Sequence, residues 1–138
     1  MGAPLERSND YWNVGIRHPN ALDTEANAII GAIGAKNMSV VTSGDYQRYY
    51  EADGMRYCHI IDPATLMPAA LYRGVTVAHA DSCMADILST ALFIMPQEEG
   101  HMLAEAHNAA AIWVLPDLSV LTNGYYDVLS GNYDKSTQ

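Results

Sequence analysis

Apolar residues in the first third of this chain gather in short runs that are typical of β-strands. The runs are Trp12–Ile16, Ala28–Ile33 and Met38–Thr42, each of them too short for a helix. Turn-forming residues at Gly34–Asn37 separate the second run from the third. We therefore expect the second and third runs to pair with each other as a hairpin.

A tight-turn sequence, Ala52-Asp53-Gly54, lies in the middle of the chain between two further strand-like segments. Gln47–Glu51 precedes this turn and Met55–Ile61 follows it, so a second hairpin is predicted. The second of these strands is expected to end at Asp62-Pro63, because proline has no N–H group with which to continue the pairing.

Helical spacing begins in the second half of the chain. After a predicted strand at Arg73–Ala78, either Asp81 or Ser82 can cap a helix that runs to Met95. Residues three and four positions apart would give this helix one apolar stripe. The stripe consists of Met84, Leu88, Ala91 and Met95.

A second helix is predicted from Pro96 to about Asn108, because proline is favoured where a helix begins. Two more strands, Ala110–Leu115 and Ser119–Thr122, follow it around a turn. Strands, then two consecutive helices, then strands predict an α+β fold, loosely α/β. We expect a mixed β-sheet with both helices on one face.

Composition limits the classes of function that this chain can have. The 138 residues are 49% hydrophobic and 17% charged, which is typical of a folded soluble chain and long enough for a single domain over residues 1–138. The net charge of −9 repels nucleic acid and anionic membrane surfaces, so neither is expected as a partner. No apolar run is long enough to span a membrane, and no secretion signal is expected at the start. Residues 131–138 have the composition of a flexible tail.

Asp86 and Thr90 are the most informative polar residues, because they interrupt an otherwise apolar helix four positions apart. That spacing places both oxygens on one helical face, one turn apart. Together with Ser82 and Ser89, the pair could simply form an exposed polar edge that faces water. Alternatively, apolar neighbours on most of the helix circumference would bury the carboxylate, which would then need a partner. A carboxylate and a hydroxyl are suitable ligands for Mg²⁺ or Ca²⁺.

His59 lies beside the predicted strand end, where functional residues often gather, and strand alternation would place it on one face with Tyr57 and Ile61. A partly buried structural histidine is the alternative. The other histidines are expected at the surface, with His79 notable because it precedes the helix of Asp86. These residues are His18, His79, His101 and His107.

The segment Thr42-Ser43-Gly44-Asp45 resembles an ordinary turn, and turn chemistry is one explanation for it. The other is a loop that presents N–H groups and a hydroxyl to a phosphate. A Ser43-His59-Asp62 hydrolase is not favoured, because the nucleophile-elbow pattern is absent. Two cysteines, Cys58 and Cys83, are too few for a disulfide framework and are expected to be small buried residues.

Taken in order, these segments resemble the C-terminal half of the FAD:protein FMN transferase (ApbE) family. The similarity runs from about Trp12 to Val120. It is carried by Trp12-Asn13-Val14-Gly15-Ile16, His18-Pro19, Val41-Thr42-Ser43-Gly44-Asp45-Tyr46, His59-Ile60-Ile61-Asp62-Pro63, Val75-Thr76-Val77, Ala85-Asp86 and Thr90-Ala91-Leu92.

The resemblance implies part of a T-fold-like flavin-transferase domain, which moves FMN from FAD to a threonine or serine of a target protein while AMP leaves. It implies that Asp86 and Thr90 are Mg²⁺ ligands and that His59 is catalytic. The residues implied to contact FAD are Ser43, Gly44, His59, Ile60, Asp62, Cys83, Met84 and Ala85. The expected partners are FAD and an acceptor protein. The resemblance also favours the periplasmic side of a bacterial cell envelope.

The chain departs from the family in three ways. Ala64-Thr65-Leu66 replaces the family's arginine, threonine and glycine, and Cys58 replaces a serine. Family enzymes are also about twice this length. The chain could therefore be a fragment, one part of a split enzyme, or a degenerate relative. A second chain or a homodimer could complete it. The alternatives to transfer are a non-catalytic module that binds flavin nucleotide and metal, and an interaction domain.

Overall fold

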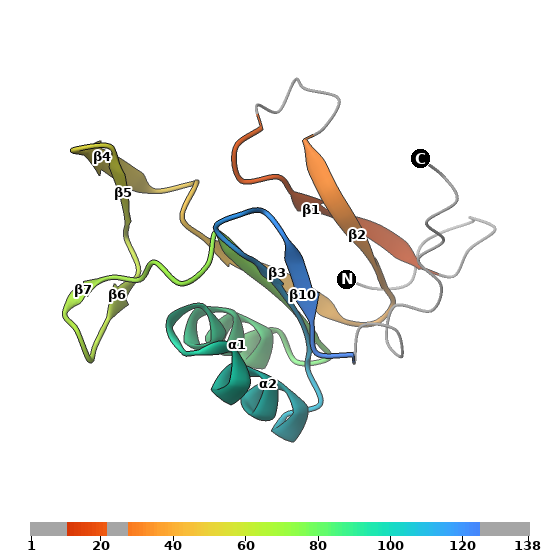
Figure 1. The fold of residues 1–138 in the computed structure, drawn as a ribbon. Helices are drawn as coiled ribbons and strands as arrows, with labels where there is room; N and C mark the ends of the chain where they lie inside the picture. Colours follow the sequence, from red (N-terminus) through yellow and green to blue (C-terminus); the bar gives the residue numbers. More distant parts are fainter. Residues whose placement is uncertain (1–10, 22–27, 125–138) are drawn as a thin grey trace.

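The computed structural model describes residues 11–21 and 28–124, and a four-stranded antiparallel sheet lies at its centre (Figure 1). The strand order is β10-β9-β8-β3, so β3 lies at one edge. The bounds are Val120–Thr122 for β10, Ala110–Val114 for β9, Gly74–His79 for β8 and Ser39–Gly44 for β3.

Two consecutive helices cover one face of this sheet, as predicted. They are α1 (Ser82–Ile94) and α2 (Gln97–Ala106), with Asp81 and Pro96 at their N-caps. Strand alternation sends Val75 and Val77 of β8 and Trp113 of β9 toward the helices. There they pack with Leu88, Leu92 and Phe93 of α1, and this is the larger of the two core clusters.

The opposite face of the sheet is covered by a separate two-stranded hairpin formed by β1 (Trp12–Arg17) and β2 (Ile29–Ala35). Ile16 and Ile33 of the hairpin pack on Ala78, Ala110 and Ile112 of the sheet, which have the opposite orientation to the residues under the helices. Apolar side chains on both faces explain why all residues of β9 are buried.

The predicted hairpin between the second and third apolar runs is wrong, although both strands exist. β2 pairs with β1 and β3 pairs with β8, each in antiparallel register. The pairing puts β3 beside the fully buried valines of β8, and it leaves residues 36–38 as a connection between two layers. Asn37 in that connection has a φ of 52°, which is typical of a turn.

The α+β class is confirmed, but the parallel pairing that a mixed sheet requires does not occur among the described strands. The two helices explain this. One crossover helix would return the chain to the start of β8, whereas two successive helices bring it back to the end of β8. The pairing of Ala78 with Ala110 shows that β9 begins where β8 ends.

Two smaller hairpins extend from the sheet beside β3 (Figure 1). One consists of β4 (Tyr49–Ala52) and β5 (Met55–Cys58), and its turn at Asp53-Gly54 confirms the prediction. The other consists of β6 (Ile61–Asp62) and β7 (Met67–Pro68).

The predicted single strand over residues 55–61 is therefore two strands with a break at residues 59–60. The break arises because the N–H of His59 donates to the carbonyl of Arg48, while the Ile60 carbonyl accepts from Ala69. The chain thus changes partner between the two hairpins, and His59 lies in the connection rather than in a strand. No helix in the described part of the chain is long and apolar enough to cross a membrane. The predicted tail at residues 131–138 lies outside the described residues.

Candidate functional site

The end of β3 meets the middle of α1 through side-chain hydroxyl groups. The Ser43 Oγ atom lies 2.9 Å from the Oγ of Ser89 and 3.4 Å from the Oγ1 of Thr90. Both α1 residues also bond back to the Asp86 carbonyl oxygen, at 2.9 Å for Ser89 and 3.5 Å for Thr90. The structure therefore brings together Ser43, Thr90 and the helical turn that begins at Asp86.

Asp86 and Thr90 are exposed, so the argument that burial forces the Asp86 carboxylate to have a partner is wrong. The buried face of α1 is formed by Ala85, Leu88, Ser89, Leu92 and Phe93, so the predicted stripe is correct for Leu88, while its other members, Met84, Ala91 and Met95, are half-buried. Ile87 is 57% exposed, which shows that apolar residues on the outer face do not bury the pair. The alternative of an exposed polar edge is correct for Ser82, Asp86 and Thr90 and wrong for Ser89, which is buried. Asp86 and Thr90 are thus accessible to a ligand.

The N-terminus of α1 is closed by its own cap. The Asp81 carboxylate accepts hydrogen bonds from the N–H groups of Cys83 at 2.8 Å and Met84 at 3.0 Å, and its carbonyl accepts from Ala85 at 3.0 Å. These three backbone donors are thus occupied. Cys83 is exposed rather than buried as expected, whereas Cys58 is buried as expected.

Thr42-Ser43-Gly44 forms the end of β3, so the loop expected at these residues is wrong and the bend begins at Asp45. The Tyr46 ring folds back over this strand end. A Cβ atom at Gly44 would lie 2.6 Å from the Tyr46 Cε1 atom, so glycine is required for this close approach.

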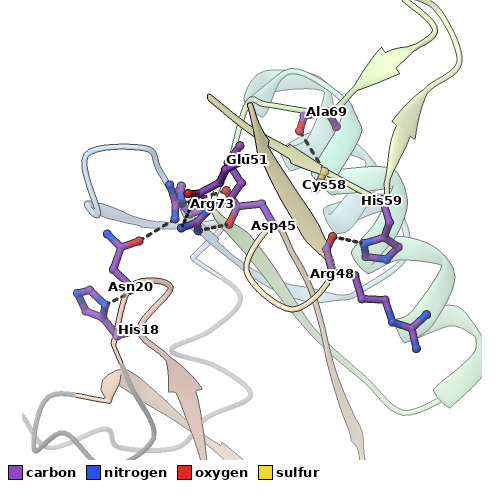
Figure 2. Close-up of polar contacts among 10 residues, drawn as sticks. His18, Asn20, Asp45, Arg48, Glu51, Cys58, His59, Ala69 and Arg73 are labelled. Atoms are coloured by element: carbon purple, nitrogen blue, oxygen red, sulfur yellow. Dashed lines mark hydrogen bonds and ion pairs between the residues drawn. The ribbon is translucent and has the colours of Figure 1, made fainter. Parts of the chain in front are cut away.

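Asp45 anchors the bend that follows the site (Figure 2). Its carboxylate is nearly buried, with Arg73 Nε at 3.1 Å from Oδ2 and Arg56 Nη1 at 3.7 Å from Oδ1. Burial raises the pKa of the Asp45 carboxyl, and the two guanidinium groups oppose that rise. Arg73 also donates to Asn20 Oδ1 at 2.8 Å, which joins this cluster to the chain after β1.

His59 is exposed and is placed by the break between β5 and β6. Its Nδ1 atom lies 3.3 Å from the carbonyl oxygen of Arg48 (Figure 2). Because a carbonyl can only accept, Nδ1 carries the hydrogen when this bond is made. The Nε2 atom of neutral His59 is then the basic nitrogen.

Asp62 organises the turn of the β6–β7 hairpin. Its carboxylate accepts from the Ala64 N–H at 2.8 Å and from the Thr65 hydroxyl at 3.0 Å. Leu66 in that turn has a φ of 59°, a left-handed conformation that favours glycine, at the position where the family usually has glycine. Ser43, His59 and Asp62 each bond to different partners, so they form no hydrolase triad.

Sequence reasoning missed Ser89, the Asp45 cluster and the setting of His101. Ser89 lies one helical turn after Ala85, which is on the buried face of α1. This spacing is the signal that could have predicted the burial of Ser89. Of the four histidines expected at the surface, His107 is exposed, whereas His18, His79 and His101 are half-buried. The ring of His101 stacks on Trp113 with centroids 4.7 Å apart.

The donor chemistry of Asp86 and Thr90 fits a hard cation, because both offer oxygen atoms from one exposed helical face. The described residues contain no group of three or more histidine, cysteine, aspartate or glutamate side chains that could hold a metal ion. An octahedral ion would therefore need oxygens from substrate phosphates and water beside these two.

Comparison with known proteins gives consistent matches. The ApbE family model matches residues 1–113. The FAD:protein FMN transferase of Treponema pallidum is 39% identical over 111 residues, covering 79% of this chain and 30% of the relative. The enzyme of the same name from Haemophilus influenzae is 33% identical over 128 residues, covering 92% of this chain and 35% of the relative.

Solved structures agree with this fold. The ApbE protein of Thermotoga maritima superimposes with a TM-score of 0.78 and 32% identity, over 88% of this chain and 39% of that protein. The flavinyl transferase ApbE of Pseudomonas stutzeri, in its apo form, gives a TM-score of 0.66 and 33% identity. The chain thus spans about a third of the length of the curated relatives that it matches, so the expectation that family enzymes are about twice its length is wrong. From the family match and these similarities together, the chain belongs to the ApbE family.

Proposed function

We propose that this chain is the C-terminal part of an enzyme that transfers FMN from FAD to a threonine or serine hydroxyl of a target protein, with Mg²⁺. Family membership and the names of the relatives support flavin transfer. The single observation that supports the site is the contact of the β3 end with the Asp86–Thr90 turn of α1.

The reaction needs positioning and charge neutralisation more than covalent help from the protein. The acceptor oxygen forms a bond to the phosphorus on the FMN side of the FAD pyrophosphate. The bond from that phosphorus to the bridging oxygen breaks, and AMP leaves with the electron pair. The hydroxyl proton must pass to a base. Mg²⁺, when bound, neutralises pyrophosphate charge, which matters in a protein of net charge −9.

Asp86 and Thr90 would hold the cation from the exposed face of α1, and the Ser43-Gly44 strand end lies beside them. We place the nucleotide along this strand end and along Cys83, Met84 and Ala85. Since the backbone N–H groups of the last three are occupied by Asp81, contacts there would come from side chains and carbonyl groups. Ile60 and Asp62 would line the part of the site near His59.

His59 is proposed as the base. Its exposed ring has room for an acceptor hydroxyl, and the bond from Nδ1 to Arg48 leaves Nε2 free to accept a proton. Binding of flavin nucleotide and metal without transfer is the alternative, because this chain spans about a third of its relatives. We propose that the remainder of the fold, supplied by further sequence, a second chain or a homodimer, is needed for turnover. The periplasmic side of a cell envelope is the proposed location.

Asp86→Asn tests the cation site. In the protein completed by the remaining part of the transferase fold, the substitution should weaken Mg²⁺ binding and abolish FMN transfer, because it removes the ligand charge while keeping the size of the side chain. Mg²⁺ binding is measured by titration calorimetry, and transfer to a threonine-containing acceptor peptide by mass spectrometry. Equal Mg²⁺ affinity and equal transfer rates for variant and parent would refute the assignment.

His59→Ala tests the proposed base. We expect kcat to fall by roughly 10²–10⁴-fold, the usual contribution of general acid–base catalysis, while FAD affinity and the urea midpoint stay near parental values. Arg48→Ala is the matched control, since the Arg48 carbonyl that contacts His59 belongs to the backbone and remains. A His59→Ala protein that transfers FMN at the parental rate would show that this histidine has no catalytic part.

A further inference from the structure

We propose that Ser89 is a positioning residue, which acts through Ser43 to keep the lone pairs of the Thr90 hydroxyl available to a divalent cation. This inference rests on the proposed function, since the cation site is part of it.

Ser89 is a polar residue in a place that packing alone would give to an apolar one. Its side chain is 0% exposed and lies on the face of α1 that also buries Leu88 and Phe93. Alanine is a better helix former and would bring no polar group into the core. Packing alone therefore does not explain the hydroxyl of Ser89, whereas its hydrogen bonds do.

The direction of these hydrogen bonds follows from counting hydrogens. The carbonyl of Asp86 can only accept, so the single hydrogen of the Ser89 hydroxyl goes to it across 2.9 Å. Ser43 must then donate its own hydrogen to Ser89 Oγ across 2.9 Å. After this donation, the Ser43 oxygen can only accept a further hydrogen bond.

This arrangement of donors and acceptors determines which hydrogen bonds the Thr90 hydroxyl can make. Its hydroxyl hydrogen has two acceptors on the protein side, Ser43 Oγ at 3.4 Å and the Asp86 carbonyl at 3.5 Å. Neither acceptor can donate to Thr90 in return, so both lone pairs of its exposed oxygen remain free. A cation ligand must offer a lone pair, and this arrangement supplies one from Thr90.

The roles of the two serines can be separated by mutation, because Ser89 is the acceptor to which Ser43 donates its hydrogen. In Ser89→Ala, Ser43 has no acceptor at position 89 and can donate to Thr90 instead, which occupies a lone pair. In Ser43→Ala/Ser89→Ala, that competing hydrogen is gone. The double variant should therefore bind the cation more tightly than Ser89→Ala alone. A purely structural role would make the double variant weaker than either single variant.

The control is a matched hydroxyl pair on the opposite face of the same strand. Thr42 Oγ1 and Thr76 Oγ1 lie 2.8 Å apart, across paired residues of β3 and β8. Thr76 is also buried, and because Val75 and Val77 on either side of it face the helices, strand alternation turns Thr76 away from them. Thr76→Val removes this bond without reaching α1, so it should leave cation affinity unchanged.

The experiment titrates Mn²⁺ into the 138-residue chain saturated with FAD, with free Mn²⁺ followed by electron paramagnetic resonance. The FAD affinity of each variant is measured separately, because Ser43 is also a proposed FAD contact. Urea unfolding checks each variant for folding. We expect Ser89→Ala to weaken Mn²⁺ binding about tenfold, the lower end for partners that orient metal ligands. We expect the double variant to recover part of this loss and Thr76→Val to match the parent.

Parental affinity in Ser89→Ala, a double variant weaker than Ser89→Ala, or an equal loss in Thr76→Val would each overturn the inference. Failure of the proposed function looks different. In that case the parent binds no Mn²⁺, or Asp86→Asn and Thr90→Val bind it as the parent does, and the inference falls together with the cation site.

Discussion

The two sides of the candidate site are built in different ways. On one side, Asp86 and Thr90 project from a helix whose inner face packs on Trp113, Val75 and Val77 of the central sheet. On the other side, His59 and Asp62 lie on two hairpins with exposed large side chains, such as Tyr50 at 62% and Leu66 at 77%. The hairpins contact the core near their bases, through Cys58, Ile60 and Ala69, and Arg56 of β5 adds an ion pair with Asp45.

This difference separates a fixed part of the site from an adjustable part. Side chains in a close-packed core hold α1 in one position, as the cation site proposed on this helix would require. The hairpins are held mainly by local bonds, such as those from Asp62 to its own turn. Elements with few buried contacts open at low free-energy cost, so this side of the site could adapt to the proposed acceptor protein.

Trp113→Ala should give the largest loss of stability, because it disrupts the packing under the fixed side of the site. Trp113 is fully buried, stacks on His101, and contributes to the cluster under the helices. Truncation of a buried tryptophan costs about 3–5 kcal/mol. Urea unfolding followed by circular dichroism measures the loss, and Trp113→Phe serves as a milder variant if the first does not fold.

Tyr50→Ala is the matched change on the hairpin side. It removes a stack on Tyr57 with ring centroids 5.0 Å apart, but on an exposed surface, so the loss should stay below about 1 kcal/mol. Similar losses for Trp113→Ala and Tyr50→Ala would contradict the division of the site into a fixed and an adjustable side.

Gly54→Ala sharpens the comparison within the hairpins. Gly54 has a φ of 73° and open space around it, so alanine brings backbone strain of about 1 kcal/mol without a clash. Because the β4–β5 tip makes few core contacts, amide hydrogen exchange in β4 and β5 should accelerate about fivefold. Exchange in β8 and β9 should not change, and acceleration there as well would show that the hairpin opens together with the sheet.

Asp117→Ala should give the smallest loss of stability, and that loss should depend on pH. The Asp117 carboxylate accepts from the Ser119 hydroxyl at 2.6 Å and from the Ser119 N–H at 2.9 Å, which lowers its pKa below the ordinary 3.8. Since the folded pKa is the lower one, the stabilisation is present above pH 3.8 and is lost as the pH falls through the folded pKa.

The Asp117→Ala variant should therefore be slightly less stable than the parent at pH 7, and the difference should vanish in acid. Urea unfolding at pH 7 and at a pH below the folded pKa of Asp117 measures this difference in stability. Ser119→Ala removes the same hydroxyl bond and should show the same trend, whereas a difference that grows in acid would contradict the assignment.

Local patterns in the sequence were enough to predict most elements. The Asp81 cap, the Asp53-Gly54 turn and the helix after Pro96 depend on neighbouring residues, and all three occur as predicted. Strand pairing depends on residues far apart in the chain. That is why the sequence suggested a hairpin between β2 and β3, where the structure pairs β3 with β8.

The candidate site was predictable in its residue types and less so in its surroundings. The spacing of Asp86 and Thr90 does place them on one face, but which face is buried depends on where the sheet lies. Ser89 shows the same limit, since its burial is decided by contact with β3. The hydrogen-bond partner of His59 is likewise the carbonyl of Arg48, on the other side of the hairpin. No local pattern reveals a contact between residues so far apart in the sequence.

The antiparallel return of the chain through α1 and α2 has a consequence for how the protein folds. Gly74 at the start of β8 pairs with Val114 at the end of β9, so the whole β8-α1-α2-β9 segment begins and ends at neighbouring positions. The pairings that close this segment join residues up to 40 positions apart, from Gly74 to Val114, and the entropic cost of closure rises only slowly with the length of the closed segment. We therefore expect the part of the chain that carries the proposed cation ligands to assemble without the hairpin of β1 and β2, which covers the opposite face of the sheet.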